Sequence, residues 1–243
     1  SGISGESNES TETDNSNEAT ETDQSSGDGS DNTPVVESGN IYLDSNGVTI
    51  KATANAQVGD QGTINGEVYT VVDIETLKNM ISNNEDVSKV VTTKILLLER
   101  EGIFDGFFPA GFNQDISSWD VSNIIDLSFM MKGDLNMDIS YWDVSGAYKM
   151  QGMFRSNDTF NQDISSWDVS NVVTMEWMFE GAISFNQDLS SWDVSNVWTM
   201  ENMFNRAANF NQDISSWDVS NVTSCGGFSL FVDGWTLPKP NFT

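Results

Sequence analysis

The chain has 243 residues and a formal net charge of −27, with 10 basic residues against 37 acidic ones. This charge disfavours binding to nucleic acid and to anionic lipid surfaces, and favours cations, a basic partner or simple solubility. The sequence contains no His, and its single Cys, Cys225, has no intrachain disulfide partner. The most common transition-metal ligand and acid–base group is therefore missing.

The first segment, residues 1–39, is predicted to be a disordered acidic tether. It consists almost entirely of acidic residues, Ser, Thr, Asn and Gly, and no Lys or Arg occurs before Lys51. A chain of this composition buries too little apolar surface to offset its conformational entropy, and its like charges extend it. Two interpretations stay open: a solubilising tail, and a spacer that holds the folded part away from a surface.

Residues 40–94 are predicted to form a small α/β capping unit. Two pairs of strands are each separated by an Asn-Gly turn, which indicates hairpins, and Asp73 can cap a short helix. The segment is small for an independent domain, so we expect it to close the open end of the repeats that follow. The predicted elements are strands 41–43, 48–51, 62–64 and 68–72, a helix at 75–81 and a strand at 87–95.

A repeat with a fixed period occupies residues 95–236. Each complete copy contains Trp-Asp, and successive Trp residues are 23, 25, 25 and 25 positions apart. These residues are Trp119, Trp142, Trp167, Trp192 and Trp217. A regular period of this size is typical of a solenoid, in which each repeat buries its apolar face against its neighbours.

Each repeat divides into two halves with different apolar patterns. In the first half, the pattern predicts a short strand with Ile164, Trp167 and Val169 inward and with Ser166 and Asp168 outward. The second half has apolar residues at helical spacing, namely Val172, Met175, Met178, Phe179 and Ala182. The expected fold class is therefore α/β: a leucine-rich-repeat-like solenoid of strand-plus-helix repeats, with residues 237–243 as a C-terminal tail.

The second repeat departs from the pattern in two places. Its segment from Met130 to Asp138 is two residues shorter than in the other copies, between the predicted helix and the next strand. In addition, Gly146 and Ala147 replace the usual Asn and Val. We therefore expect the solenoid to be least regular at this repeat.

The repeated motif runs from Phe160 through Asn-Gln-Asp-Ile-Ser-Ser-Trp-Asp-Val-Ser-Asn to Val172, followed by Met175 and Met178-Phe179. It resembles the repeat of BspA-like leucine-rich-repeat surface proteins, also described as a Mycoplasma-type domain of unknown function. The resemblance covers residues 112–236, about half of the chain. Residues 41–95 and the ending from Trp235 also resemble the flanks of such proteins in Bacteroidetes-type bacteria.

The resemblance implies a protein that is secreted or lipid-anchored, faces outward at the cell surface or outer membrane, and takes part in adhesion. It transfers no catalytic residues. The acidic, Ser-rich start is similar to the stretch that follows the lipidated Cys of surface-exported lipoproteins. That Cys is absent from this sequence, so contact with a membrane would depend on an anchor outside it.

Two sets of Asp residues recur once per repeat. The first is expected to form an outward ladder, and consists of Asp120, Asp143, Asp168, Asp193 and Asp218. The second precedes the predicted strand, and consists of Asp115, Asp138, Asp163, Asp188 and Asp213. The carboxylates either accept hydrogen bonds from the Ser hydroxyls and amides of the adjacent turn or coordinate Ca²⁺, which prefers such oxygens. No other cofactor is expected. Identical copies disfavour an enzyme, because a catalytic pair of carboxylates needs two different environments.

The Asn residues at 123, 171, 196 and 221 are expected to be structural, because side-chain amides at a repeated turn usually bond to neighbouring backbone groups. The more informative positions differ between repeats: Ile125/Phe129, Tyr148/Gly152, Val173/Trp177, Trp198/Asn202 and Thr223/Gly227. Large aromatic residues beside the core stripe either pack between repeats or contact a ligand. The candidate binding residues are Phe129, Tyr148, Trp177 and Trp198. The next candidates are the row Ser118, Tyr141, Ser166, Ser191 and Ser216.

Three functions remain open at this stage. The first is a non-enzymatic bacterial cell-surface binding or adhesion protein that presents its repeats on a flexible tether to a surface protein or polysaccharide. The second is a glycan-capturing accessory lipoprotein of a polysaccharide uptake system, in complex with an outer-membrane transporter. The third is a structural component of a surface layer.

Overall fold

The computed structural model describes residues 39–95 and 104–242. All described residues belong to one compact unit, residues 33–243. The predicted tether, residues 1–39, therefore lies outside the described residues except for Gly39. Within the described ranges, no helix combines the length and the apolar character needed to cross a membrane.

Both predicted hairpins are confirmed. The first pairs two antiparallel strands in which Ile41 lies opposite Ala52, and the second pairs two in which Ile64 lies opposite Glu67. Asn65 and Gly66 adopt left-handed φ angles of 54° and 83°, which suits a two-residue hairpin turn. The four strands are β1 (Ile41–Leu43), β2 (Ile50–Ala52), β3 (Gln61–Ile64) and β4 (Glu67–Val71).

The predicted helix is also confirmed, and α1 spans Ile74–Ser82. The Asp73 carboxylate accepts a hydrogen bond from the amide of Thr76 at 2.8 Å, as expected for an N-cap. Of the strand predicted at 87–95, only β5 (Val90–Val91) forms, in parallel with β4.

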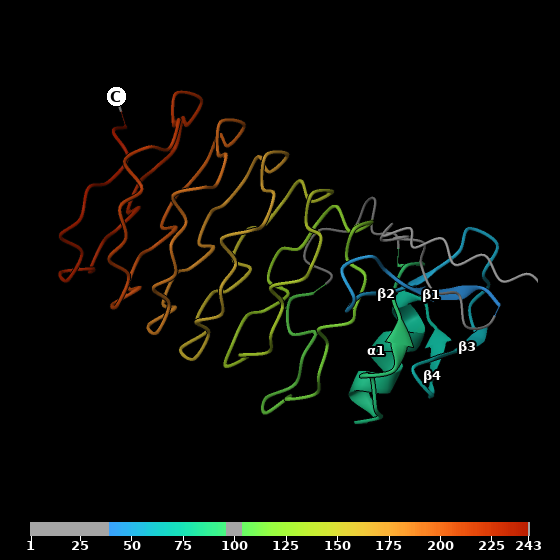
Figure 1. Ribbon diagram of the computed structural model, residues 1–243. Helices are drawn as coiled ribbons and strands as arrows, with labels where there is room; N and C mark the ends of the chain where they lie inside the picture. Colours follow the sequence, from blue (N-terminus) through green and yellow to red (C-terminus); the bar gives the residue numbers. More distant parts are fainter. Residues whose placement is uncertain (1–38, 96–103, 243) are drawn as a thin grey trace, which may run out of the picture. The chain divides into compact units, whose positions relative to one another are not determined.

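The repeats do not contain the predicted strands and helices, so the prediction of an α/β leucine-rich-repeat solenoid is wrong. In the described ranges, α1 is the only helix, and the named strands β1–β5 all precede the repeats. The repeats are successive coils built mainly from turns, which follow one another from green to red in Figure 1. Isolated parallel bridges join neighbouring coils at Asp126, Lys149, Thr174, Thr199 and Ser224.

The backbone hydrogen bonds explain why the second half of each repeat is not helical. The amide of Met175 donates to the carbonyl of Thr199 in the next coil at 3.1 Å, and alternate amides along the coil do the same. The amides between them close short turns within the coil, as Met178 does onto the carbonyl of Met175 at 3.2 Å. Trp177 and Gly181 have φ angles of 55° and 70°, a left-handed conformation that interrupts a right-handed helix.

The inward and outward faces nevertheless follow the prediction. Ile164, Trp167 and Val169 are buried, whereas Ser166 and Asp168 are exposed. The residues that were assigned to the buried face of a helix also lie in the core, namely Val172, Met175, Met178, Phe179 and Ala182. The apolar spacing therefore identified the buried positions correctly and the backbone conformation incorrectly.

Aromatic side chains stack from coil to coil in the core. The rings of Phe179 and Phe204 are parallel within 7°, with centroids 5.3 Å apart. The indole Nε1 of Trp192 donates to the carbonyl of Ile164 in the preceding coil at 3.1 Å, and every other repeated Trp makes the corresponding bond. These side chains donate toward the preceding coil, whereas the alternate backbone amides donate toward the following one.

The stack of coils begins earlier than the repeated motif. The Oδ1 atom of Asp86 accepts from the amide of Ser88 at 2.9 Å, as Asp115 does from Ser117 one coil later. The carbonyl of Val87 accepts the indole N–H of Trp119 at 3.0 Å, in the place that Ile or Leu occupies between full repeats. Residues 86–88 therefore act as a degenerate copy of Asp-Ile-Ser, and the cap shares its core with the coils.

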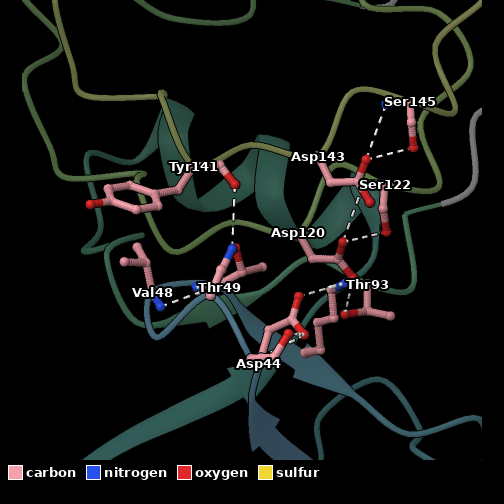
Figure 2. Close-up of polar contacts among 12 residues, drawn as sticks. Asp44, Val48, Thr49, Thr93, Asp120, Ser122, Tyr141, Asp143 and Ser145 are labelled. Carbon is pink, nitrogen blue, oxygen red and sulfur yellow. Dashed lines mark hydrogen bonds and ion pairs between the residues drawn. The ribbon is translucent and has the colours of Figure 1, made fainter. Parts of the chain in front are cut away.

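The β1–β2 hairpin packs against the first coils, and Figure 2 shows the polar contacts at this junction. The amide of Ile50 donates to the carbonyl of Ser118 at 2.9 Å, and the Thr93 hydroxyl donates to Asp120 at 2.7 Å. Asp120 is only 3% exposed, which differs from the outward position predicted for it. Although burial acts to lower the pKa of Lys51, its hydrogen bond to Asp44 and the charge of Asp120 raise it above its ordinary value.

The irregularity predicted for the second repeat is present. Its shortened segment is held by Asn157, which is fully buried in the following coil. The Asn157 amide donates to the carbonyls of Met131 at 3.0 Å and Leu135 at 2.6 Å. Later coils have Ala182 and Ala207 at the same position. A buried polar side chain therefore satisfies the carbonyls of the shortened segment.

Candidate functional site

Every Asp of the two repeated sets accepts a hydrogen bond from the amide of the Ser two residues later. At Asp143, shown in Figure 2, the Ser145 amide donates at 3.1 Å and the Ser145 hydroxyl at 2.6 Å. This is the local side-chain-to-backbone bonding that stabilises turns. The hydrogen-bonding interpretation of the Asp sets therefore accounts for all of them.

The same contacts set the electrostatics of the Asp ladder. Hydrogen bonds from the hydroxyl and the amide of Ser170 hold the pKa of Asp168 below its ordinary value of 3.8, although burial and the like charge of Asp193 act to raise it. Within the described ranges, no three acidic or Cys side chains come together in a group that could hold a metal ion. The geometry thus shows turn stabilisation at these residues.

Two ladders of side-chain amides join the exposed edges of the coils. In the predicted one, the Asn171 amide donates to the carbonyl of Ser145 at 2.8 Å, and the other Asn residues of that set bond similarly. Sequence reasoning missed the second one. There, the backbone amide of Asn186 donates to Asn161 Oδ1 at 2.9 Å, and Gln187 Nε2 donates to the carbonyl of Asn161 at 3.0 Å. The repeated Asn-Gln pair was the signal that could have revealed it.

Two of the four candidate binding residues lie in one row across the coils. The amide of Val173 donates to the carbonyl of Tyr148 at 3.0 Å, and the amide of Trp198 donates to the carbonyl of Val173 at 3.0 Å. The side chains of Tyr148 and Trp198 are 50% and 51% exposed. Since neighbouring strands in a ladder are about 4.8 Å apart, these aromatic side chains start roughly 10 Å from each other.

The other two candidates, Phe129 and Trp177, lie in a different row and pack between coils. Both have left-handed φ angles, 62° and 55°, which are unusual for bulky residues. A Cβ atom on Gly152 would lie 2.3 Å from the Phe129 ring, so this ring rests directly on the next coil. The Arg155 guanidinium lies 5.2 Å from the centre of the Trp177 ring. Both side chains are partly exposed, and their contacts are mainly structural.

A polar row that the sequence analysis did not identify runs beside Trp177. The Nε atom of Arg155 pairs with the carboxylate of Glu180 at 2.7 Å, and Glu180 accepts from the Asn205 amide at 3.2 Å. The Oδ1 atom of Asn205 is buried and has no partner among the described residues. The signal in the sequence was the opposite charge of residues 155 and 180, one period apart.

The next candidates lie in the first half of each repeat, and several of them make structural contacts. These residues are Ser118, Tyr141, Ser166, Ser191 and Ser216. The carbonyl of Ser118 accepts from the β1–β2 hairpin, and the hydroxyl of Ser191 donates to the carbonyl of Ser165 at 2.8 Å. Tyr141 keeps a side chain that is 49% exposed, although its carbonyl accepts from Asn46 at 3.4 Å. Tyr141 therefore offers an exposed aromatic ring away from the row of Tyr148.

Comparison with known proteins identifies the repeat. A family model described as "Mycoplasma protein of unknown function, DUF285" matches residues 72–155 and 132–231. Together these segments include most of the coils, begin at residue 72 within the capping unit and include the degenerate copy at residues 86–88. No curated protein and no solved structure matches the chain.

Proposed function

The chain belongs to the DUF285 family, and on this basis we propose that it is a non-enzymatic binding protein displayed at a bacterial cell surface. The family match supports the BspA-like resemblance at the level of the repeat. Surface display, secretion and a lipid anchor belong to the proposal, and they rest on the resemblance to BspA-like proteins and to the start of surface lipoproteins. A Bacteroidetes-type origin is also part of the proposal, and it rests on the resemblance of the flanking sequences.

The observation that carries the proposal is the exposure of Tyr148 and Trp198 in one row. The equivalent residues in the other described coils are Ile125, Val173 and Thr223, so the fold does not require an aromatic side chain at this position. Exposing half of a large aromatic side chain has no structural benefit here, whereas its flat face can contact a sugar ring or an apolar patch of a protein. We propose that this row is the binding surface for a surface protein or a polysaccharide.

The repeated Asp residues have the same kind of hydrogen-bonding partner in every coil, and this supports the proposal of a binding function rather than catalysis. The acidic residues recur with the same Ser partner in each coil, as Asp168 does with Ser170 and Asp193 with Ser195. General acid–base catalysis by two carboxylates needs their pKa values to be driven apart by unlike surroundings. Hydrogen bonds from Ser lower the pKa of both of these carboxylates in the same way.

The test compares Tyr148→Ser and Trp198→Ser with Tyr141→Ser, which removes an equally exposed aromatic ring that is not part of this row. The probes are a glycan array and an array of purified extracellular proteins. We expect the first two variants to lose at least tenfold in affinity for whichever probe the unchanged protein binds, and the third to bind normally. Normal binding by both row variants, with melting temperatures unchanged, would refute the proposal. If the unchanged protein binds to the glycan array and not to the protein array, the result favours the polysaccharide-capture function.

A further inference from the structure

The second repeat, whose segment from Met130 to Asp138 is two residues short, borders two hollows in the surface of the coils. One has a volume of about 370 Å³ and lies between residues 105–111 and residues 132–135. The other has a volume of about 660 Å³ and lies between residues 112–117 and residues 134–138. Asp134, in the segment that lacks two residues, lines both of them.

The larger hollow lies where the Asn–Gln ladder is interrupted. In later coils, Gln162 Nε2 donates to Asn136 Oδ1 at 3.0 Å, and the equivalent Gln residues repeat this bond. The second repeat has Met137 at the position of Gln162, and a thioether donates no hydrogen bond. Among the described residues, no corresponding bond joins Asn136 to Asn113 in the preceding coil. The sequence change therefore removes the link that closes this edge elsewhere.

The shortened segment beside the hollow is held in place rather than left loose. Asn157 donates to the carbonyls of Met131 and Leu135, and its own Oδ1 accepts from the amide of Phe160 at 3.0 Å. Leu135 is buried in the core, and Met137 packs against it. A hollow whose walls are fixed by buried contacts is preformed, as binding sites for small groups usually are.

The chemistry of the larger hollow selects a cationic group. Three carboxylates line it, Asp115, Asp134 and Asp138, and none of the described residues lining it is Lys or Arg. Phe112 and Met137 supply apolar surface within the same hollow. Long basic side chains bury their methylene stems against apolar surface and direct the charged head to carboxylates. The net charge of −27 attracts the same class of ligand over longer distances.

We propose that this hollow binds an Arg or Lys side chain from a basic segment of a partner protein. The stem would lie against Phe112 and Met137, and the cation would meet the Asp134 and Asp138 carboxylates. Arg suits the site better than Lys, because its planar guanidinium donates to two carboxylates at once. This site is independent of the row containing Tyr148 and Trp198.

The test uses a fluorescently labelled, glycine-spaced arginine peptide and the same peptide with citrulline, which is uncharged and of similar shape. Met137→Gln restores the residue found in later coils, and we expect it to bond to Asn113 and close the hollow. Asp138→Asn removes one charge and keeps an acceptor for the Ser140 amide. We expect each variant to weaken binding of the arginine peptide about tenfold, measured by fluorescence anisotropy.

The matched control is Asp188→Asn, which makes the same charge change at the same repeat position, where Ser190 is the partner. It should leave affinity within about twofold, because an exposed charge away from the site is largely screened. Equal weakening by Asp138→Asn and Asp188→Asn would show that the peptide binds the general negative charge, which overturns the proposal. Equal affinity for the citrulline peptide would do the same, as would neutral oligosaccharides that displace the arginine peptide. Trp198→Ser should bind the arginine peptide normally, which separates this outcome from the test of the proposed function.

Discussion

Removal of one core Trp should show how much a single coil contributes to the stack. Trp192 is only 3% exposed, and its indole lies parallel to that of Trp217 with centroids 6.5 Å apart. Truncation of a buried Trp to Ala costs about 3–5 kcal/mol. The substitution also removes one of the two hydrogen bonds accepted by the carbonyl of Ile164, which keeps the bond from the amide of Trp167 at 3.2 Å, and this adds about 0.5–1.5 kcal/mol. Trp192→Ala should therefore lower the free energy of unfolding by about 3.5–6.5 kcal/mol.

A loss of this size approaches the whole stability of an ordinary domain, so a milder variant is needed beside it. Trp192→Phe keeps an aromatic ring that can stack on Trp217 and removes the indole N–H. Its main cost should be the loss of the hydrogen bond from the indole to the carbonyl of Ile164, about 0.5–1.5 kcal/mol, because that carbonyl still accepts from the amide of Trp167. Urea unfolding followed by far-ultraviolet circular dichroism gives both values, because this signal comes mainly from the peptide backbone, whereas Trp fluorescence would itself change with the substitution.

Three outcomes can be distinguished. A graded loss, larger for Ala than for Phe, supports a core position in which both packing and the hydrogen bond contribute. Equal losses would show that the bond from Trp192 to Ile164 carries the whole effect. A loss below about 1 kcal/mol for Trp192→Ala would contradict the burial of this side chain, since it falls outside the range for large-to-small substitutions in a core.

Two further predictions concern the coil surface. Gly152→Ala should lower the melting temperature more than Gly181→Ala, although both residues have left-handed φ angles. The Cβ atom added at residue 152 would lie 2.3 Å from the ring of Phe129, whereas the one added at residue 181 would meet no atom closer than 3.6 Å. Equal effects would show that the ring simply moves. Asp168→Asn should change the free energy of unfolding at pH 7 by no more than about 0.5 kcal/mol. The oxygen of the new side-chain amide still accepts the hydrogen bond from Ser170, and the repulsion between the carboxylates of residues 168 and 193 is removed. Since folding lowers the pKa of Asp168, the stabilisation by its carboxylate is present above pH 3.8 and is lost as the pH falls through the lower pKa of the folded state. Between pH 5 and pH 2, the melting temperature should therefore fall less in Asp168→Asn than in the unchanged protein.

The sequence was sufficient for the N-terminal elements and for the choice of buried residues. Asn65-Gly66 and Asp73 are local signals, since a two-residue turn and an N-cap depend on neighbouring residues alone. The repeat period and its apolar positions identified the core, including Trp167 and Phe179. The backbone of the repeats could not be obtained in this way. Consecutive turns bonded to the next coil place apolar residues at the same spacings as a helix. Trp177 itself gives no propensity signal for its left-handed conformation, although the equivalent residues Gly152, Asn202 and Gly227 share that conformation and are of types that favour it.

The candidate site was predicted in part. Variation between copies drew attention to Tyr148 and Trp198, which are exposed, and equally to Phe129 and Trp177, whose rings contact neighbouring coils or cations. Sequence variation alone does not separate exposed side chains from packed ones, because the side chain of a bulky residue with a left-handed φ angle can lie against the adjacent coil, as that of Phe129 does. The hollow at Met137 was missed, although the loss of two residues and of the repeated Gln marked its position.

The direction of the backbone hydrogen bonds has a consequence for amide hydrogen exchange. The amides of Met200 and Phe204 donate forward, to the carbonyls of Ser224 and Phe228, whereas the amide of Met203 donates back within its own coil to Met200. If the coil containing Ser224 opens, the forward-donating amides lose their acceptors at once and the intervening ones keep theirs. Exchange should then follow an alternating pattern along residues 200–207, with fast and slow amides side by side in one coil. The forward-donating amides of residues 200–206 are thus protected from exchange by the coil that follows them.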